Sequence, residues 1–284
     1  MSGEGYIRIG CFLAVSLVMA VWELAAARRP RIVSRALRWP ANLGILLLDT
    51  ALVRLLLAAL PLAIAAKTQE QGWGLLNAYH LPFWMKVACG VILLDFVIYL
   101  QHVMFHAVPV FWRLHMMHHA DLDFDFTTGG RFHPIEILLS MGIKTAAVAA
   151  LGPPPLAFLL FEVLLNATSM FNHGNVSLPP AVDRILRFIV VTPDMHRVHH
   201  SVIRGETNSN FGFNLPWWDR IGGTYRDRPA AGHDGMTIGL VQFQREKRQT
   251  LPWMLTLPFR EGGGGYPMDR SAGRGRGDKE HPDR

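Results

Sequence analysis

Five apolar stretches set the strongest limit on the fold of this 284-residue chain. Three are long enough to cross the hydrocarbon core of a bilayer, roughly 30 Å, which takes about 20 helical residues. Two shorter ones follow, separated only by Gly152, Pro153 and Pro154, and this break permits no more than a tight turn. The predicted spans cover residues 9–27, 45–66, 82–105, 134–151 and 155–171. The sequence therefore predicts an all-α, multi-pass transmembrane helix bundle whose last two spans form a hairpin.

The composition agrees with a membrane protein. Half of the residues are hydrophobic and 18% are charged, a balance that suits lipid contact better than a soluble domain of this length. The net charge of +6 does not indicate a nucleic-acid partner, because the basic residues gather in short segments between and after the apolar runs, as the positive-inside rule expects. The start of the chain lacks the basic segment of a signal peptide, so we expect the first stretch to be retained as a span.

The chain divides into three regions by composition. Residues 1–174 form the transmembrane helical region and include the first two histidine motifs described below. Residues 175–260 are more polar, are punctuated by Pro and Gly, and predict a cytoplasmic cap of helices and loops that carries a third histidine motif. Residues 261–284 lack the apolar content to pack and predict a disordered tail.

Three histidine motifs indicate a metal site. They are HxxxH at His102 and His106, HxxHH at His115, His118 and His119, and HxxHH at His196, His199 and His200. With 13 histidines in the chain, a chance HxxHH should appear on the order of 0.03 times. On a helix, the first and last histidines of HxxHH share a face, while the middle one is rotated by about 100° and can address a neighbouring ion. Two such segments therefore suit a centre with two metal ions.

The charge pattern places these motifs on one side of the membrane. Five arginines crowd the connection between the first two spans, which the positive-inside rule assigns to the cytoplasm: Arg28, Arg29, Arg31, Arg35 and Arg38. Counting spans from that connection puts the HxxxH motif at the cytoplasmic end of the third span. Both HxxHH motifs, and His173 after the fifth span, then follow on the same side.

We predict two ligand groups from this placement. One ion takes His102, His106, His115, His119 and His199, and the other takes His118, His173, His196 and His200. Imidazole suits zinc, copper, iron and nickel alike, so the ligand type does not select the metal. His133 opens the fourth span on the same side, where it is interpreted as a ligand, as a hydrogen-bond donor to a ligand, or as a helix-start residue.

Polar residues near the motifs are candidates for holding the ligating imidazoles by hydrogen bonds. They are Asp95, Tyr99, Glu136, Asn175, Asn208 and Asp219. For Asp95, the alternative is a structural ion pair with Lys144 or Arg54. No catalytic residue beyond the metal ligands is predicted.

The ordered motifs between Asp95 and Tyr225 resemble the fatty acid hydroxylase and sterol desaturase superfamily. The matching segments are DFVIYLQHVMFH, WRLHMMHHADLDFDFTTGGRFHPIE, NHGN, TPDMHRVHHS and NSNFGFNLPWWDRIGGTY. Val103 stands where many members carry a basic residue, and this departure leaves the ligands intact. The resemblance implies that the nine histidines hold two iron ions at the cytoplasmic face. It also implies an O2-dependent oxidoreductase that hydroxylates or desaturates an unactivated C–H position of a lipid from the bilayer.

The electrons for such a reaction are expected from a separate protein. The chain shows neither a dinucleotide fingerprint nor a CxxCH haem-attachment motif, so we expect a cytochrome b5-like protein, or a ferredoxin with its reductase, to dock on the basic cytoplasmic face. Abundant Ala, Gly and Arg favour a bacterial gene and hence a bacterial inner membrane. Two alternatives stay open, namely a metal transporter or metal-buffering membrane protein, and a membrane hydrolase with two zinc ions.

Overall fold

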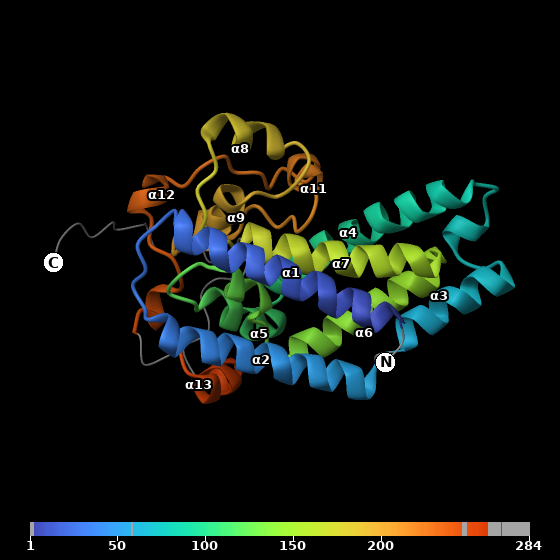
Figure 1. Ribbon diagram of the computed structural model, residues 1–284, viewed down its shortest axis with the longest axis horizontal. Helices are drawn as coiled ribbons and strands as arrows, with labels where there is room; N and C mark the ends of the chain where they lie inside the picture. Colours follow the sequence, from blue (N-terminus) through green and yellow to red (C-terminus); the bar gives the residue numbers. More distant parts are fainter. Residues whose placement is uncertain (1–2, 58, 246–248, 261–267, 269–284) are drawn as a thin grey trace.

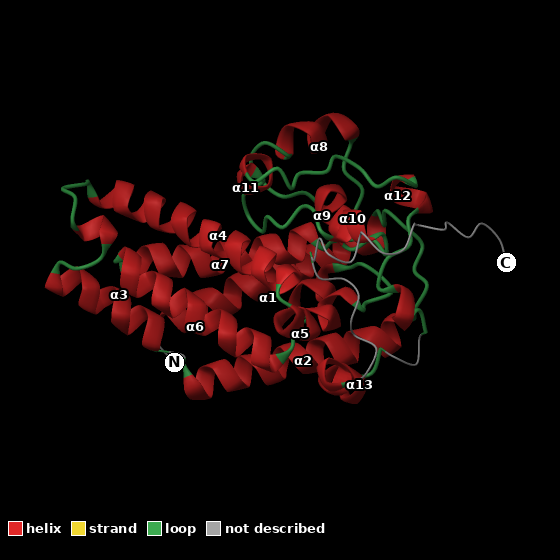
Figure 2. Cartoon of the chain, turned by 180° about the vertical axis from the view of Figure 1, so that it is seen from behind, coloured by secondary structure: helices red, strands yellow, loops and turns green. Residues whose placement is uncertain are grey.

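The computed structural model is an elongated helical bundle with a smaller layer of helices and loops gathered toward one end (Figures 1 and 2). It describes residues 3–57, 59–245, 249–260 and 268, so the predicted tail lies outside the described residues apart from Met268. The long helices are α1 (Gly3–Ala25), α2 (Arg35–Leu56), α4 (Phe83–Ala107), α6 (Pro134–Leu151) and α7 (Pro155–Asn172). All five are long and apolar enough to cross a membrane. The predicted all-α multi-pass bundle is confirmed, and the chain is an integral membrane protein.

Shorter elements connect and cover the long helices. The α-helices among them are α3 (Leu60–Gln71), α5 (Pro109–His119), α8 (Pro180–Leu186), α9 (Pro193–His199), α10 (Arg204–Thr207), α11 (Trp217–Ile221), α12 (Gly232–Gly235) and α13 (Leu251–Thr256). The 3-10 turns are η1 (Leu75–Asn77), η2 (Phe126–Gly130), η3 (Val241–Phe243) and η5 (Leu257–Phe259). The described residues form no β-strand and only two isolated bridges, Ala27 with Val176 and Ser201 with Ile238.

The second predicted span, residues 45–66, is not one helix. Helix α2 starts at Arg35, well before the apolar run, and ends at Leu56, and α3 begins only at Leu60. Pro61 stands in the first turn of α3, where its missing N–H costs nothing. Inside a continuous helix the same proline would lose a hydrogen bond and its ring would clash with the carbonyl of Leu57. The break therefore follows from one residue whose effect the hydropathy pattern does not show.

Helices α6 and α7 form the hairpin that the Gly-Pro-Pro break predicts. Gly152 ends α6 in the left-handed conformation, with φ 61°. A Cβ atom at this position would lie 2.5 Å from the carbonyl oxygen of Trp73, so glycine is required for both conformation and space. The hairpin returns the chain to the end of the bundle where α6 began. His173, which caps α7, is thereby brought to the other histidine motifs.

Apolar packing between helices holds the bundle together. Ile45 of α2 is buried against α5 and α13, Leu94 of α4 against α3, α6 and α7, and Met19 of α1 against η2 and α7. Side chains on the outer faces are apolar as well, since Leu17 is 67% and Leu55 81% exposed. Such faces suit acyl chains rather than water.

The arginine-rich connection between α1 and α2 lies at the same end of the bundle as all three histidine motifs (Figure 1). The backbone N–H of Arg28 donates to the carbonyl oxygen of Asn175 at 3.0 Å, and the Arg29 guanidinium donates to that of Met236 at 2.7 Å. These contacts tie the connection to the segments that surround the histidines. We refer to this end as the histidine end.

Candidate metal centre

The nine histidines of the predicted ligand set converge in two adjacent groups. Cluster A consists of His102, His106, His115, His119 and His199, and cluster B of His118, His173, His196 and His200. In each cluster the nitrogen atoms that could bind an ion all lie within 4.8 Å of one another. The rings of His119 and His200 stack with their centroids 4.7 Å apart, so the clusters share a border. The structure thus groups the histidines in the same two sets as the motif spacing does.

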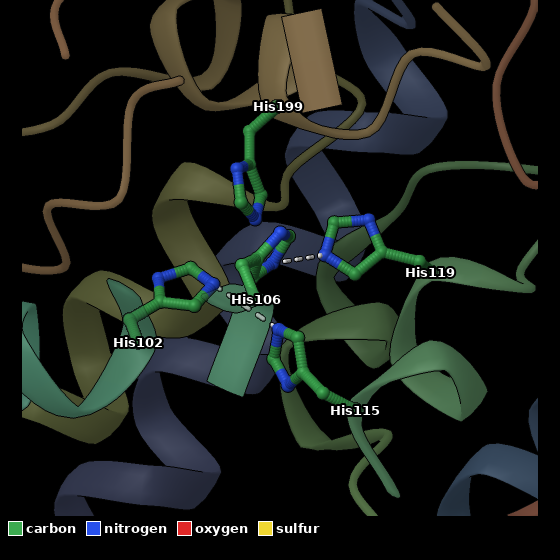
Figure 3. Close-up of side chains that lie close together, drawn as sticks. All are labelled: His102, His106, His115, His119 and His199. Atoms are coloured by element: carbon green, nitrogen blue, oxygen red, sulfur yellow. Dashed lines mark hydrogen bonds between the residues drawn. The ribbon is translucent and has the colours of Figure 1, made fainter. Parts of the chain in front are cut away.

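Four helices deliver these rings. Helix α4 carries His102 and His106 one turn apart, and α5 carries the first HxxHH motif. The second HxxHH motif lies on α9 and ends at its C-cap, His200, and His173 caps α7. Each HxxHH segment serves both clusters: α5 sends its middle histidine, His118, to cluster B, and α9 sends His199 to cluster A. The rotation of about 100° between neighbouring helical residues produces this division. Figure 3 shows the five rings of cluster A pointing toward a common centre.

All nine histidines are buried. None is more than 3% exposed. Burial lowers the pKa of His115 and of His173 to about 3. Burial also lowers the pKa well below its usual value for His118, His119, His196, His199 and His200. At neutral pH these rings are therefore in the uncharged state that binds a metal ion.

Oxygen acceptors hold the proton of five rings on Nδ1. Three rings donate to backbone carbonyl oxygens: His102 to Phe211 at 2.8 Å, His199 to Ser209 at 2.7 Å and His173 to Ser169 at 2.7 Å. Two donate to side chains: His106 to Asn208 Oδ1 at 3.1 Å and His115 to Glu136 Oε1 at 2.6 Å. A neutral imidazole has one N–H, so Nε2 of each ring keeps a lone pair for an ion. The same bonds fix the ring orientations.

The facing nitrogen atoms of cluster A fit a cation. The Nε2 atoms of His102 and His115 lie 3.1 Å apart, and both carry lone pairs because the protons are on Nδ1. The Nε2 atom of His199 is buried and has no hydrogen-bond partner among the described residues. Buried acceptors left without a donor cost free energy. An ion among them would satisfy all three, and neutral imidazole nitrogens are suitable donors for iron, zinc or copper.

Asp219 holds the loop that supplies the acceptors for cluster A. Its carboxylate accepts hydrogen bonds from the backbone N–H groups of Phe211 at 2.7 Å and Gly212 at 2.8 Å. The Thr224 hydroxyl donates to the same carboxylate at 2.7 Å. Asp219 therefore acts on His102 indirectly, through the carbonyl of Phe211. Of the six residues predicted to hold the imidazoles, Glu136 and Asn208 bond directly to a histidine of the clusters, and the other four do not.

Asp95 holds the same loop from helix α4. Its carboxylate accepts hydrogen bonds from the backbone N–H of Leu215 at 3.1 Å and from the indole N–H of Trp218 at 2.8 Å. The hydroxyl of Tyr99, one turn further along α4, lies 3.0 Å from that of Thr224. Asp95 and Tyr99 therefore fix residues 211–224 against α4 and do not contact an imidazole through these bonds.

Both sequence-based interpretations of Asp95 are corrected by these contacts. The carboxylate is occupied by donors of the loop, so it does not orient His102, whose Nδ1 donates to a carbonyl instead. Lys144, proposed as its ion-pair partner, lies 2.7 Å from Glu162 Oε1. Among the described residues, no ion pair joins Asp95 to Lys144 or Arg54.

Asn175 and His133 lie outside both clusters. The Asn175 side chain bonds to the backbone N–H and C=O of Arg29, at 3.0 and 2.9 Å, and so fixes the connection between α1 and α2. His133 caps α6: its Nδ1 accepts from the backbone N–H of Ile135 at 3.2 Å, so its Nε2 donates to the carbonyl of Leu255 at 3.2 Å. With both nitrogens engaged, His133 is a helix-start residue, one of the three interpretations offered for it.

A buried ion-pair network behind α5 was not predicted. Arg38 donates to both carboxylate oxygens of Asp121 at 2.7 Å and to Asp125 at 2.6 Å, and Arg131 donates to the carbonyl of Met117 at 3.0 Å. Burial alone would raise the pKa of Asp121, but Arg38 and Arg131 hold it below its usual value. The aspartates at alternate positions after the second histidine motif are the sequence feature that could have indicated this network. From the sequence alone, Arg38 indicates only the side of the membrane.

Comparison with known proteins gives a family match and several relatives of similar sequence. Residues 87–224 match the model of the fatty acid hydroxylase family. An ornithine lipid hydroxylase of Rhizobium tropici is 30% identical over 186 residues, which are 62% of this chain and 54% of the relative. An alkylglycerol monooxygenase of Homo sapiens is 29% identical over 188 residues, 62% of this chain and 39% of the relative. A methylsterol monooxygenase of Arabidopsis thaliana is 28% identical over 170 residues, which are 58% of this chain and 63% of the relative.

The chain thus covers less than two thirds of the length of these relatives. No solved structure matches it. The matched residues 87–224 nevertheless contain every histidine of clusters A and B, together with the loop that Asp95 and Asp219 hold. They also contain nearly all of the motifs on which the resemblance rested. Over residues 87–224 the chain is similar to the fatty acid hydroxylase family.

Proposed function

We propose that this chain is a membrane-bound di-iron oxygenase that hydroxylates or desaturates an unactivated C–H position of a lipid. The observation that carries the proposal is the pair of buried clusters, nine imidazoles at one end of a membrane-spanning bundle. The family match and the relatives, which are named as lipid hydroxylases and monooxygenases, favour oxygen chemistry over metal transport or hydrolysis.

The protein's part in such a reaction follows from its contacts. Iron ions held by clusters A and B would supply the reduction of dioxygen and the abstraction of hydrogen from an unactivated carbon. The carbonyls of Phe211 and Ser209 hold His102 and His199 in one orientation, and Glu136 does the same for His115. Burial of these rings keeps bulk water away from the centre.

Electrons and protons must reach this centre from outside the chain. Converting C–H to C–OH, with the second oxygen atom leaving as water, consumes two electrons and two protons. We propose that a separate redox protein, cytochrome b5-like or a ferredoxin with its reductase, docks at the histidine end. Exposed arginines there, such as Arg31 in the connection between α1 and α2, would attract an acidic partner.

We propose that the histidine end faces the cytoplasm of a bacterial inner membrane. The support is the positive-inside rule applied to the arginine-rich connection between α1 and α2, which lies at that end (Figure 1). A reporter enzyme fused after Arg260 should be active only in the cytoplasm. Activity on the opposite side of the membrane would contradict this orientation.

The reaction is tested by comparing the lipids of cells that express the wild-type chain, His199→Ala or His133→Ala. A lipid that gains one oxygen atom, or loses two hydrogen atoms, should appear with the wild type and with His133→Ala. It should be absent with His199→Ala, because His199 belongs to cluster A and His133 only caps a helix. The purified wild-type protein should carry iron and require oxygen.

Three results would count against the proposal. Protein with full iron, a reduced electron donor and oxygen that oxidises no lipid would contradict the oxygenase function. Product formation without oxygen would favour a di-zinc hydrolase. Metal flux into liposomes that contain the chain would favour a transporter.

A further inference from the structure

An apolar surface of the cap lies beside the bundle rather than beyond its end. Helix α8, the turn after it and α11 expose six large apolar side chains. They are Val182 (43% exposed), Ile185 (64%), Phe188 (60%), Ile189 (60%), Trp217 (41%) and Ile221 (77%). In both views of the molecule these two helices lie next to each other at the side of α4 and α7 (Figures 1 and 2). We refer to these six side chains as the α8–α11 patch.

Direct contacts join the two parts of the patch. The indole N–H of Trp217 donates to the carbonyl of Phe188 at 2.7 Å, and the guanidinium of Arg220 donates to the carbonyl of Arg187 at 3.1 Å. The Arg220 guanidinium also lies 5.0 Å from the centre of the Phe188 ring. These contacts join α11 to the turn after α8, so the six apolar side chains form one continuous surface.

The contacts of α11 with α4 indicate how deep the patch lies in a membrane that α4 crosses. Trp218 of α11 bonds to Asp95 at 2.8 Å and packs on Phe96 with ring centroids 4.8 Å apart. Asp95 is the central residue of α4, and helical rise puts it about 18 Å from the C-terminal end of that helix. At about 37 Å, α4 is only slightly longer than a hydrocarbon core of roughly 30 Å. A bilayer crossed by α4 therefore surrounds Asp95 and the α11 residues that contact it.

The chemistry of the patch fits this depth. Soluble surfaces rarely expose so many large apolar side chains together, because water makes such exposure costly. Against acyl chains the same exposure costs nothing. Arg184, exposed on α8 beside the patch, can reach toward anionic headgroups, and Trp217 has the amphipathic character of residues at membrane interfaces.

We infer that the α8–α11 patch is immersed in the leaflet on the histidine side, with lipid acyl chains as its partner. The cap is then partly a membrane-embedded element and not wholly a cytoplasmic domain. The loop that orients His102 is held between α4 and this embedded surface, through Asp95 and Trp218. This inference depends on the membrane-spanning bundle and not on the proposed reaction, so either can fail alone.

Spin labels on the patch test the inference. Single cysteines at Ile185→Cys, Ile189→Cys and Ile221→Cys are labelled in a background that lacks Cys11 and Cys89, and the protein is placed in bilayers of phosphatidylcholine with phosphatidylglycerol. The matched control is Asp234→Cys, whose native side chain is 80% exposed on α12 at the histidine end (Figure 1). We expect the ratio of collisions with oxygen to collisions with a water-soluble nickel chelate to be several-fold higher at the three patch positions.

Two outcomes of the spin-label experiment would overturn the inference. Ratios equal to that of the control would place the patch in water. Low collision rates with both reagents would mean that protein, and not lipid, covers it. A second measurement needs no substitution: a membrane-dissolved carbene reagent should label residues 182–189 and 217–221 of the wild-type protein as heavily as the outer face of α1, and an absence of label there would refute the proposal.

Discussion

Replacing Arg38 with methionine is the sharpest test of how this fold supports its metal centre. The Arg38 side chain is fully buried and binds two carboxylates, with bonds of 2.7 Å to each oxygen of Asp121 and 2.6 Å to Asp125. Methionine can occupy much of the same space but leaves both carboxylates without this partner. The nearest remaining cation, Arg131, is 3.8 Å from Asp121.

The expected cost is large on the scale of protein stability. Removing one partner of a buried ion pair costs about 3–5 kcal/mol, because a charge stays buried without compensation. Total stabilities are of the order of 5–15 kcal/mol. We therefore expect the melting temperature of Arg38→Met to fall by the order of 10 °C. Because Asp121 follows His119 by two residues, the iron content should fall as well.

The assay is thermal unfolding in detergent micelles, followed by tryptophan fluorescence, with iron measured by mass spectrometry. Arg38→Lys keeps the positive charge but loses the planar guanidinium group, so its melting temperature should lie between those of the wild type and Arg38→Met. The combined variant Arg38→Met, Asp121→Asn, Asp125→Asn should recover part of the loss, because no unpaired charge remains. Arg228→Met, at a side chain that is 79% exposed, is the surface control. If Arg38→Met lowers the free energy of unfolding by about 1 kcal/mol or less, as the loss of a surface ion pair does, then the buried network does not stabilise the segment that follows the second histidine motif.

Four further predictions concern the site itself. Glu136→Gln should weaken iron binding by about 10–100-fold, measured by competition with a chelator, because an amide holds an imidazole N–H less strongly than a carboxylate does; unchanged affinity would contradict the role of Glu136. His199→Ala should purify with less iron than His133→Ala, and equal iron in the two variants would argue against the assignment of cluster A. Asp95→Asn should speed hydrogen exchange at the backbone N–H of Leu215, whereas wild-type protection would show that the loop is held by other contacts. Protein stripped of iron by a chelator should have a free energy of unfolding about 4 kcal/mol lower than protein with free iron at 1,000 times its Kd. Adding iron back should restore the melting temperature.

Local patterns were enough to predict the bundle and the two clusters. Hydropathy over about 20 residues identifies a span, and the i, i+4 relation within HxxxH and HxxHH fixes which rings share a face of a helix. That rotation separates His118 and His199 from the outer histidines of their motifs, but it does not decide which histidines of the two motifs share an ion, so the predicted division was a guess that the two groups match. The same reasoning missed the break before Pro61, because an apolar proline does not interrupt a hydropathy average.

The supports of the clusters could not be predicted in the same way. The carbonyls that hold His102 and His199 belong to the backbone of Phe211 and Ser209, and a backbone acceptor leaves no mark in a sequence. Asp95 was misinterpreted because its partners lie about 120 positions further along the chain. Glu136 was a correct candidate, since a carboxylate close in sequence to the motifs is itself a local signal.

The division of each HxxHH segment between two clusters has a consequence for how the centre assembles. Helices α5 and α9 each contribute to both clusters, so an ion bound in cluster A restrains the same two helices that must be ordered for cluster B. The second ion then meets rings whose freedom has already been reduced, and its binding loses less conformational entropy. Metal loading of this chain should accordingly be cooperative, and preparations at half occupancy should contain molecules with two ions and molecules with none.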